Sequence, residues 1–127
     1  MDIDRFVEDC AEANRGDNAQ SAVLEVLAKA VSEPRAVLAA VGDPTAAGLN
    51  VLYRSPDLTI FAATWTPQMN LMPHNHEMWA NIGIYTGRED NIMWRRTEGS
   101  IEARGARALF ERDAVALPVD AIHSVTN

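Results

Sequence analysis

The sequence is poor in residues that several functional classes need. It holds one cysteine, Cys10, so no disulfide can form within the chain, which fits a reducing cytosol. It holds a single lysine, and its 11 basic residues are outnumbered by 18 acidic ones, which gives a net charge of −7. This balance argues against the basic face that nucleic-acid binders require, so we expect no nucleic-acid partner.

Long apolar runs are also missing. No apolar stretch approaches the roughly 18–20 residues of a membrane span. The acidic start, MDIDRF, lacks the basic and apolar regions of a secretory signal. We therefore expect a cytoplasmic protein with no membrane partner. The length of 127 residues and the 47% apolar content suit one globular domain over residues 1–127.

The first third of the chain, residues 1–45, predicts a helical lead. Apolar residues recur at helical spacing near its start, at Ile3, Phe6, Val7 and Cys10. Two further helices are predicted, from residue 18 to about residue 31 and from residue 32 to residue 41, where Gly42 ends the pattern. The lead is too small to be a domain, so we expect it to pack against the rest of the chain.

From about residue 50 the pattern changes to short segments rich in Val, Ile, Thr and aromatic residues. The segments are LNVLYRS, DLTIFAATW, ANIGIYTG, NIMWRRTEG, SIEAR, ALFER and AVALP. Turn signals such as SPD and GRED separate them. Short strands at such close spacing are typical of a sandwich or a jelly-roll barrel, so residues 50–127 predict a mainly-β fold.

Two of the three histidines, His74 and His76, lie two residues apart in the stretch PHNHEMW. On an extended strand, side chains two apart leave by the same face, so both imidazoles can reach one metal ion. On a helix they would point about 200° apart. An isolated pair of this kind is more often chance or an exposed edge pair. The third histidine, His123, lies near the end of another strand-like segment, and a barrel that brings it to the same inner wall gathers all three into one site.

These residues resemble the two motifs of the cupins. The first motif, G-x5-H-x-H-x3–4-E-x6-G, is matched by His74, His76 and, one residue early, Gly87. The second, G-x5-P-x-G-x2-H-x3-N, is matched by Pro118, Asp120 in the glycine place, His123 and Asn127. The resemblance covers about residues 50–127. It implies a cupin double-stranded β-helix, that is, a jelly-roll barrel, preceded by the N-terminal α-helices.

The glutamate of the first motif would fall at Asn81, which is a poor metal ligand. Glu77 should face the other way on a regular strand, so we interpret it as a solvated rim residue. We therefore predict that His74, His76 and His123 bind a divalent metal without a carboxylate. Three neutral imidazoles leave the site at a charge of about +2, which attracts a small anionic substrate. Imidazole suits iron, zinc, copper and nickel, so the ligands do not choose the metal.

Within the cupins, the stretch from LYRS to GRED is similar to the cysteine-dioxygenase-like group, whose members use three histidines and Fe(II). The resemblance implies an oxidoreductase, a non-haem iron dioxygenase that transfers both atoms of dioxygen to the sulfur of a small thiol carboxylate. It also implies that Arg54 binds the substrate carboxylate and that Tyr53, Trp79 and Tyr85 line the pocket. The plainer alternatives are a surface arginine and aromatic core residues.

Members of that group continue past the second motif with further strands and with a serine–histidine–tyrosine set. The printed sequence ends on the motif's last residue, so we expect a barrel that is incomplete at its C-terminus or completed by a partner. An open sheet edge favours pairing, which predicts a homodimer. Two other functions stay open: a non-catalytic cupin that binds a metal or a small ligand, and a three-histidine dioxygenase that cleaves a dicarbonyl compound.

Overall fold

The computed structural model describes residues 1–42, 48–65, 68–75, 79–86, 88–97, 100–117 and 122–126. Its helices are α1 (Ile3–Ala13), α2 (Ala19–Val31) and α3 (Pro34–Val41). Its strands are β1 (Gly48–Ser55), β2 (Leu58–Trp65), β3 (Gln68–Asn75), β4 (Ala80–Thr86), β5 (Arg88–Thr97), β6 (Ser100–Phe110), β7 (Ala114–Leu117) and β8 (Ile122–Thr126). The three helices confirm the helical lead that the spacing of apolar residues predicts. The two segments expected at 100–104 and 108–112 belong to one strand, β6, and the turn after it.

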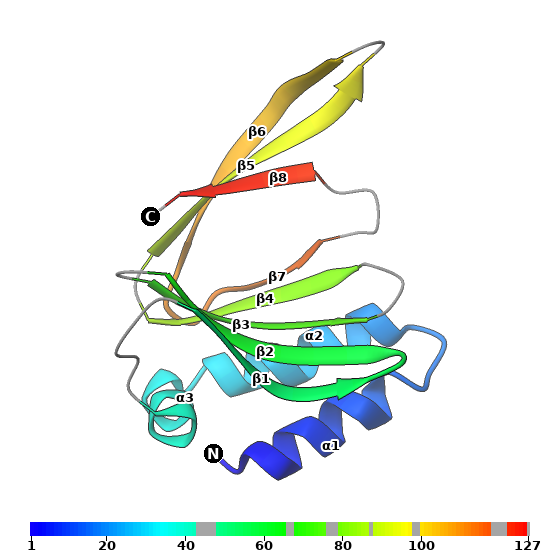
Figure 1. Ribbon diagram of the computed structural model, residues 1–127, viewed down its shortest axis with the longest axis vertical. Coiled ribbons are helices and arrows are strands. Elements are labelled where there is room, and N and C mark those ends of the chain that lie inside the picture. The colour runs from blue at the N-terminus through cyan, green and yellow to red at the C-terminus, as the bar shows by residue number, and fades with distance from the viewer. Residues whose placement is uncertain are drawn as a thin grey trace.

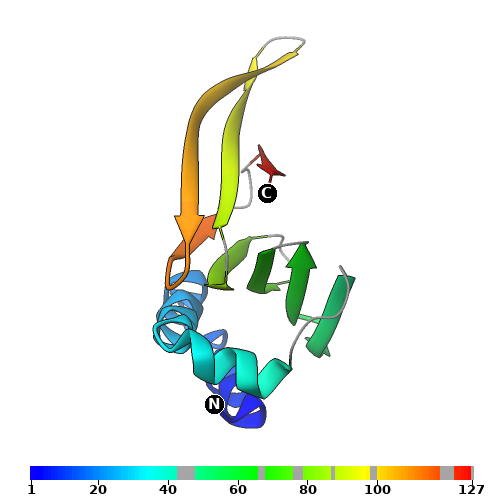
Figure 2. The ribbon, with the colours of Figure 1, turned by 90° about the vertical axis from the view of Figure 1, so that its left-hand side faces the viewer.

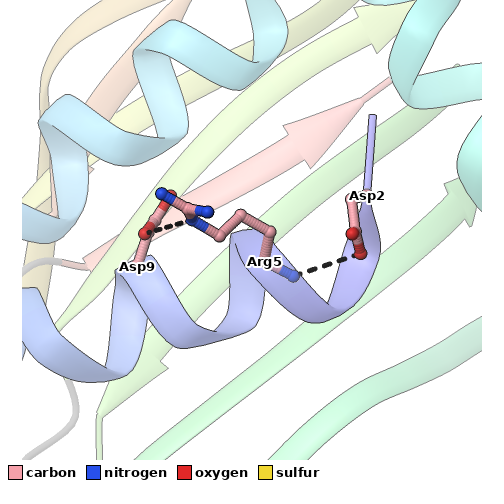
Figure 3. Close-up of polar contacts among 3 residues, drawn as sticks. All are labelled: Asp2, Arg5 and Asp9. Atoms are coloured by element: carbon pink, nitrogen blue, oxygen red, sulfur yellow. Dashed lines mark hydrogen bonds and ion pairs between the residues drawn. The ribbon is translucent and has the colours of Figure 1, made fainter.

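Side-chain contacts fix the start of α1 (Figure 3). The Asp2 carboxylate accepts a hydrogen bond from the Arg5 backbone N–H at 3.2 Å, which caps the helix. One turn further on, Arg5 Nε lies 3.4 Å from Asp9 Oδ1. Because this ion pair is exposed, it contributes only about 0.3–0.5 kcal/mol.

Among the described residues, no helix is both long and apolar enough to cross a membrane.

The described strands form two antiparallel sheets. A five-stranded sheet has the order β1-β2-β3-β4-β7, and a three-stranded sheet has the order β6-β5-β8. In the first sheet, β1 to β4 follow one another as hairpins, and β7 pairs with the other side of β4. In the second, β5 and β6 form a long hairpin that projects away from the five-stranded sheet (Figures 1 and 2).

The predicted jelly-roll barrel is wrong. No strand pairing among the described residues joins the two sheets, so these strands do not close into a double-stranded β-helix. The strands β1 to β4 pair with their neighbours in sequence and do not alternate between two facing sheets. Short connections favour such local hairpins, because closing a short loop loses little chain entropy.

The helices cover one face of the five-stranded sheet, which we call the helix face (Figures 1 and 2). Buried side chains from the helices and this sheet form its core: Phe6, Cys10, Val23, Leu27, Val31, Val37, Leu58, Ile60, Ala62, Trp79 and Tyr85. The helices come very near the sheet at Gly83 of β4, where a Cβ atom would lie 2.7 Å from Val31 Cγ1. Glycine at this position lets α2 lie directly against β4.

The opposite face of the five-stranded sheet, the far face, carries a smaller apolar cluster. Its members are Ile82, Ile84, Leu109, Val115 and Leu117, with Ala80 packed against them. Because side chains alternate along a strand, β4 turns Tyr85 toward the helices and Ile82 and Ile84 toward the far face. Strand β8 lies on the far-face side of the sheet (Figures 1 and 2).

Candidate functional site

Two of the three predicted metal ligands lie in strands whose backbone the structure describes. His74 is in β3, paired with Thr59 of β2 on one side and Ala80 of β4 on the other. His123 is in β8, paired with Met93 of β5. His76 lies outside the described residues. His74 and His123 therefore belong to different sheets, and no shared ladder brings them together.

A line of cross-strand partners runs through His74, and we call it the histidine row. It consists of Arg54, Thr59, His74, Ala80 and Leu117. Residues directly paired in an antiparallel sheet belong to the same face. Ala80 and Leu117 pack in the far-face cluster, so the row belongs to the far face. Neighbouring strands lie about 4.8 Å apart, so the Cα atoms of Arg54 and His74, two strands apart, are separated by about 10 Å.

The row ends beside the segment that leads to the third histidine. Leu117 is the last residue of β7, and β8 begins at Ile122, directly before His123. Six residues span at most about 20 Å, so His123 lies within that distance of the row's end. Strand β8 lies on the side of the sheet opposite the helices, which is the side of the histidine row (Figures 1 and 2).

The described side chains do not themselves form a metal site. Within them, no three His, Cys, Asp or Glu side chains converge on one point. The side chains of the predicted ligands lie outside that set, so this observation bears on other candidate sites. It leaves the three-histidine site as a prediction from the sequence, to which the structure adds the backbone positions of His74 and His123.

The predicted substrate-binding residues divide between the two faces of the sheet. Arg54 is exposed and belongs to the histidine row. Trp79 and Tyr85 are 6% and 2% exposed and pack in the core of the helix face, and Tyr53 packs against that core. The structure thus brings Arg54 and His74 to one face and the three aromatic residues to the other. The part of all four in substrate binding stays a prediction.

Sequence reasoning missed a pair of amide side chains that joins α2 to the end of the histidine row. Gln20 Nε2 donates hydrogen bonds to the carbonyl oxygens of Leu117, at 2.8 Å, and Ala80, at 3.3 Å. Asn81 Nδ2 donates in turn to the carbonyl oxygen of Gln20, at 3.0 Å. Asn81 is fully buried and its amide points toward α2. The only sequence signal was a polar residue in an apolar strand, and nothing in it identified a partner 61 residues away.

A polar cleft of about 700 Å³ lies on the helix side of the same sheet end. Its walls include Trp79 and Ala116, which directly precede the row residues Ala80 and Leu117. Two carboxylates, of Asp17 and Asp57, also line it, and no basic side chain does among the described residues. The cleft opens on the face opposite the histidine row, so it is separate from the predicted metal site.

Two buried groups on the helix face have shifted acidities. Burial, with a smaller contribution from the nearby Asp9 carboxylate, raises the pKa of the Cys10 thiol to about 12. Burial also raises the pKa of the Tyr85 phenol. Both groups therefore stay protonated at neutral pH. A buried thiol with so high a pKa is unreactive, so Cys10 is a core residue and not a nucleophile.

The comparison with known proteins adds no family. No model of a known protein family matches the chain, and a search of curated protein sequences found no match. The evidence for function is therefore the chemistry of the residues and the backbone arrangement of the two sheets.

Proposed function

We propose that this chain binds a divalent metal ion through His74, His76 and His123 and, with Fe(II), oxidises the sulfur of a small thiol carboxylate with dioxygen. The two histidine motifs and their resemblance to the cysteine-dioxygenase-like cupins support the chemistry. The observation that carries the proposal is the histidine row, because it puts Arg54 on the same face as His74 and two strands away. A substrate with an anionic group at each end matches a cation and a guanidinium at that spacing.

The donor set fits the proposed metal. Neutral imidazoles bind Fe(II), zinc and nickel, and they leave the charge of the ion uncompensated, which favours an anionic ligand. When bound, a ferrous ion supplies a centre at which a thiolate and dioxygen can react. Zinc has no redox chemistry of its own, so it would hold the substrate without activating dioxygen, and the identity of the metal decides between turnover and simple binding.

In this proposal the protein orients the substrate and shields the site. Arg54 binds the carboxylate, because its guanidinium is positively charged and can donate two parallel hydrogen bonds. The neighbouring apolar residues Ala80, Ile82 and Leu117 limit the access of water to the far face. The reaction is balanced without a reductant: R–SH and dioxygen give R–SO2H, in which the sulfur has lost the four electrons that dioxygen gained.

The proposal includes a location and an assembly. A cytoplasmic location fits the single cysteine, and a reducing compartment keeps a thiol substrate available. Among the described strands, β1 and β7 are the two edge strands of the five-stranded sheet. An unpaired strand edge favours pairing with a second chain, so the proposal includes a homodimer. Light scattering of the purified protein tests the assembly.

Metal content tests the ligands. We expect His74→Ala and His123→Ala each to lose most of the iron or zinc that the purified protein binds, as measured by inductively coupled plasma mass spectrometry. Glu111→Ala, a change at an exposed turn residue, serves as the control and should keep the metal. Metal content at the wild-type level in either histidine variant would contradict the assignment.

Oxygen uptake tests the reaction. The protein loaded with Fe(II) should consume dioxygen with small thiol carboxylates and form the sulfinate in equal amount. Metal bound at the histidines without uptake would indicate the non-catalytic alternative. Uptake with a dicarbonyl compound and none with thiols would indicate the carbon–carbon cleaving alternative.

A further inference from the structure

The polar cleft beside the start of α2 is large enough for a small molecule. Its volume of about 700 Å³ lies within the roughly 300–1,000 Å³ of small-molecule sites in proteins. Its walls come from the loop between α1 and α2, the first turns of α2, the turn between β1 and β2, and one end of β4 and β7. The predicted metal ligands are not among them, so a ligand of this cleft binds whether or not the chain holds a metal.

The charged side chains that line the cleft are both acidic. Asp17 lies in the loop before α2, and Asp57 lies in the turn between β1 and β2. Within the described residues, no basic side chain lines it. The first turn of α2 also lines the cleft, and the N-terminus of a helix carries about half a positive charge. Two carboxylates outweigh that half charge, so the cleft attracts a cation and repels an anion.

Hydrogen bonds hold Asp57 in position. Ser55 Oγ donates to Asp57 Oδ1 at 2.8 Å, and Asn14 Nδ2 donates to the backbone carbonyl oxygen of Asp57 at 3.2 Å. The second bond ties the turn between β1 and β2 to the end of α1, 43 residues away. Among the described residues, these bonds leave Asp57 Oδ2 for a ligand.

Asn14 adds an acceptor to the lining of the cleft. Its Oδ1 atom is buried and has no hydrogen-bond partner among the described residues. A buried acceptor without a donor destabilises the protein, and an ammonium group carries donors only. A cation with N–H groups therefore suits both the carboxylates and this amide.

The lining favours an organic cation over a metal ion. A calcium ion takes about six to eight oxygen ligands, whereas no three metal-binding side chains converge among the described residues. A bare ion would also leave most of the cleft unfilled. Leu24 and Trp79 give the cleft an apolar part, which suits a hydrocarbon chain, and an aromatic ring itself attracts a cation.

We propose that this cleft binds a small organic ammonium ion through Asp17 and Asp57. The site goes beyond the proposed function and is independent of it. Diaminobutane with an ammonium group at each end is the probe, because it offers one cation to each carboxylate. Butanediol of the same length lacks the charge, and succinate carries the opposite charge.

The test compares two variants that each remove one negative charge. Asp57→Asn keeps the size of the side chain and an oxygen for the Ser55 hydroxyl. Asp4→Asn makes the same chemical change at an exposed position of α1 that does not line the cleft. A titration followed by backbone amide NMR at low ionic strength gives the Kd for each probe and shows which residues it contacts.

We expect diaminobutane to bind and to shift the amide signals at the start of α2, butanediol to bind more weakly, and succinate not to bind. Asp57→Asn should raise the Kd for diaminobutane about fivefold, the upper end for an exposed ion pair, and Asp4→Asn should leave it unchanged. If Asp57→Asn does not fold, Asp17→Asn replaces it. Equal Kd values for the diamine and the diol, binding of succinate, or an equal loss in Asp4→Asn overturns the inference. Absence of diamine binding overturns it too, and leaves the proposed metal site untouched.

Discussion

The two faces of strand β4 show how differently one strand is used. Toward the helices, Gly83 and Tyr85 are packed against α2 and the rest of a core drawn from all three helices. Toward the far face, Ile82 and Ile84 belong to a cluster of only a few apolar residues. At the edge of that cluster the histidine row includes Thr59 and the exposed Arg54. The helix face is thus explained by packing, whereas the row on the far face is not.

This difference separates stability from binding. Burial on the helix face contributes roughly 25 cal/mol for each Å² of apolar surface removed from water, so changes there should act on folding. An exposed arginine contributes little to folding, so a change at Arg54 should act on a ligand or on nothing. Substitutions on the two faces can therefore test the contrast directly.

The largest expected effect is on the helix face at Gly83. In Gly83→Val the new Cβ atom would lie 2.7 Å from Val31 Cγ1 and 3.0 Å from Leu27 Cγ, too close for either side chain to stay in place. Overpacking of this kind lowers the free energy of unfolding by about 1–3 kcal/mol or more. Urea unfolding followed by circular dichroism measures it.

Ile84→Val is the matched control on the far face of the same strand, and it should cost only about 0.5–1.5 kcal/mol. If Gly83→Val costs no more than Ile84→Val, then α2 does not lie as close to β4 as described. The contrast between the two faces would then have to be abandoned.

A smaller effect is expected between pH 9 and 10, and it too belongs to the helix face. The Cys10 thiol has a pKa of about 12 in the folded protein against 9.0 when it is not buried, so above pH 9 the unfolded chain loses this proton first. Stability is therefore fully present below pH 9 and falls between pH 9 and 12. The slope is at most about 1.4 kcal/mol per pH unit for this one group.

Urea unfolding at a series of pH values checks the slope between pH 9 and 10, below the ordinary pKa of the Tyr85 phenol. Cys10→Ala serves as the comparison, because it lacks the titrating thiol. Its stability should be lower throughout but nearly independent of pH in that interval. If the free energy of unfolding falls equally with pH in the two proteins, the burial of Cys10 is not the cause of the loss of stability at alkaline pH.

The helices could be predicted from the sequence because their pattern is local. Phe6 and Cys10 in α1, and Val23, Leu27 and Val31 in α2, recur at the helical period and are buried in the structure. The positions of most strands were predicted for the same reason. Their partners were not, because pairing joins distant segments and the alternation of side chains does not say which strand lies beside which. The barrel was wrong for this reason.

Some features of the candidate site could likewise be predicted from the sequence, and others could not. The spacing of His74 and His76 predicts that both imidazoles leave by the same face of an extended segment, whatever the fold. The alignment of Arg54 with His74 depends on the register of two hairpins, each fixed by turn geometry and packing. Gln20 could not be identified at all, because an amide in the first turn of an amphipathic helix has no pattern that points to carbonyls 60 and 97 residues away.

The smallest effect on stability, and the sharpest use of the contrast, is expected at Arg54. Because this side chain is exposed, Arg54→Ala should change the free energy of unfolding by no more than about 0.5 kcal/mol. If Arg54 binds the substrate carboxylate, the same variant should raise KM for a thiol carboxylate by about tenfold or more, because hydrogen bonds to a charged group contribute roughly 1.5–3 kcal/mol. KM for a thiol that lacks the carboxylate should not change.

Arg35→Ala, which removes an exposed arginine from α3 on the helix side, is the control for lost charge and should leave both KM values as they are. An equal rise in KM for both thiols, or the same rise in Arg35→Ala, would mean that the loss of positive charge weakens substrate attraction in general, and the row would then hold no specific place for a carboxylate.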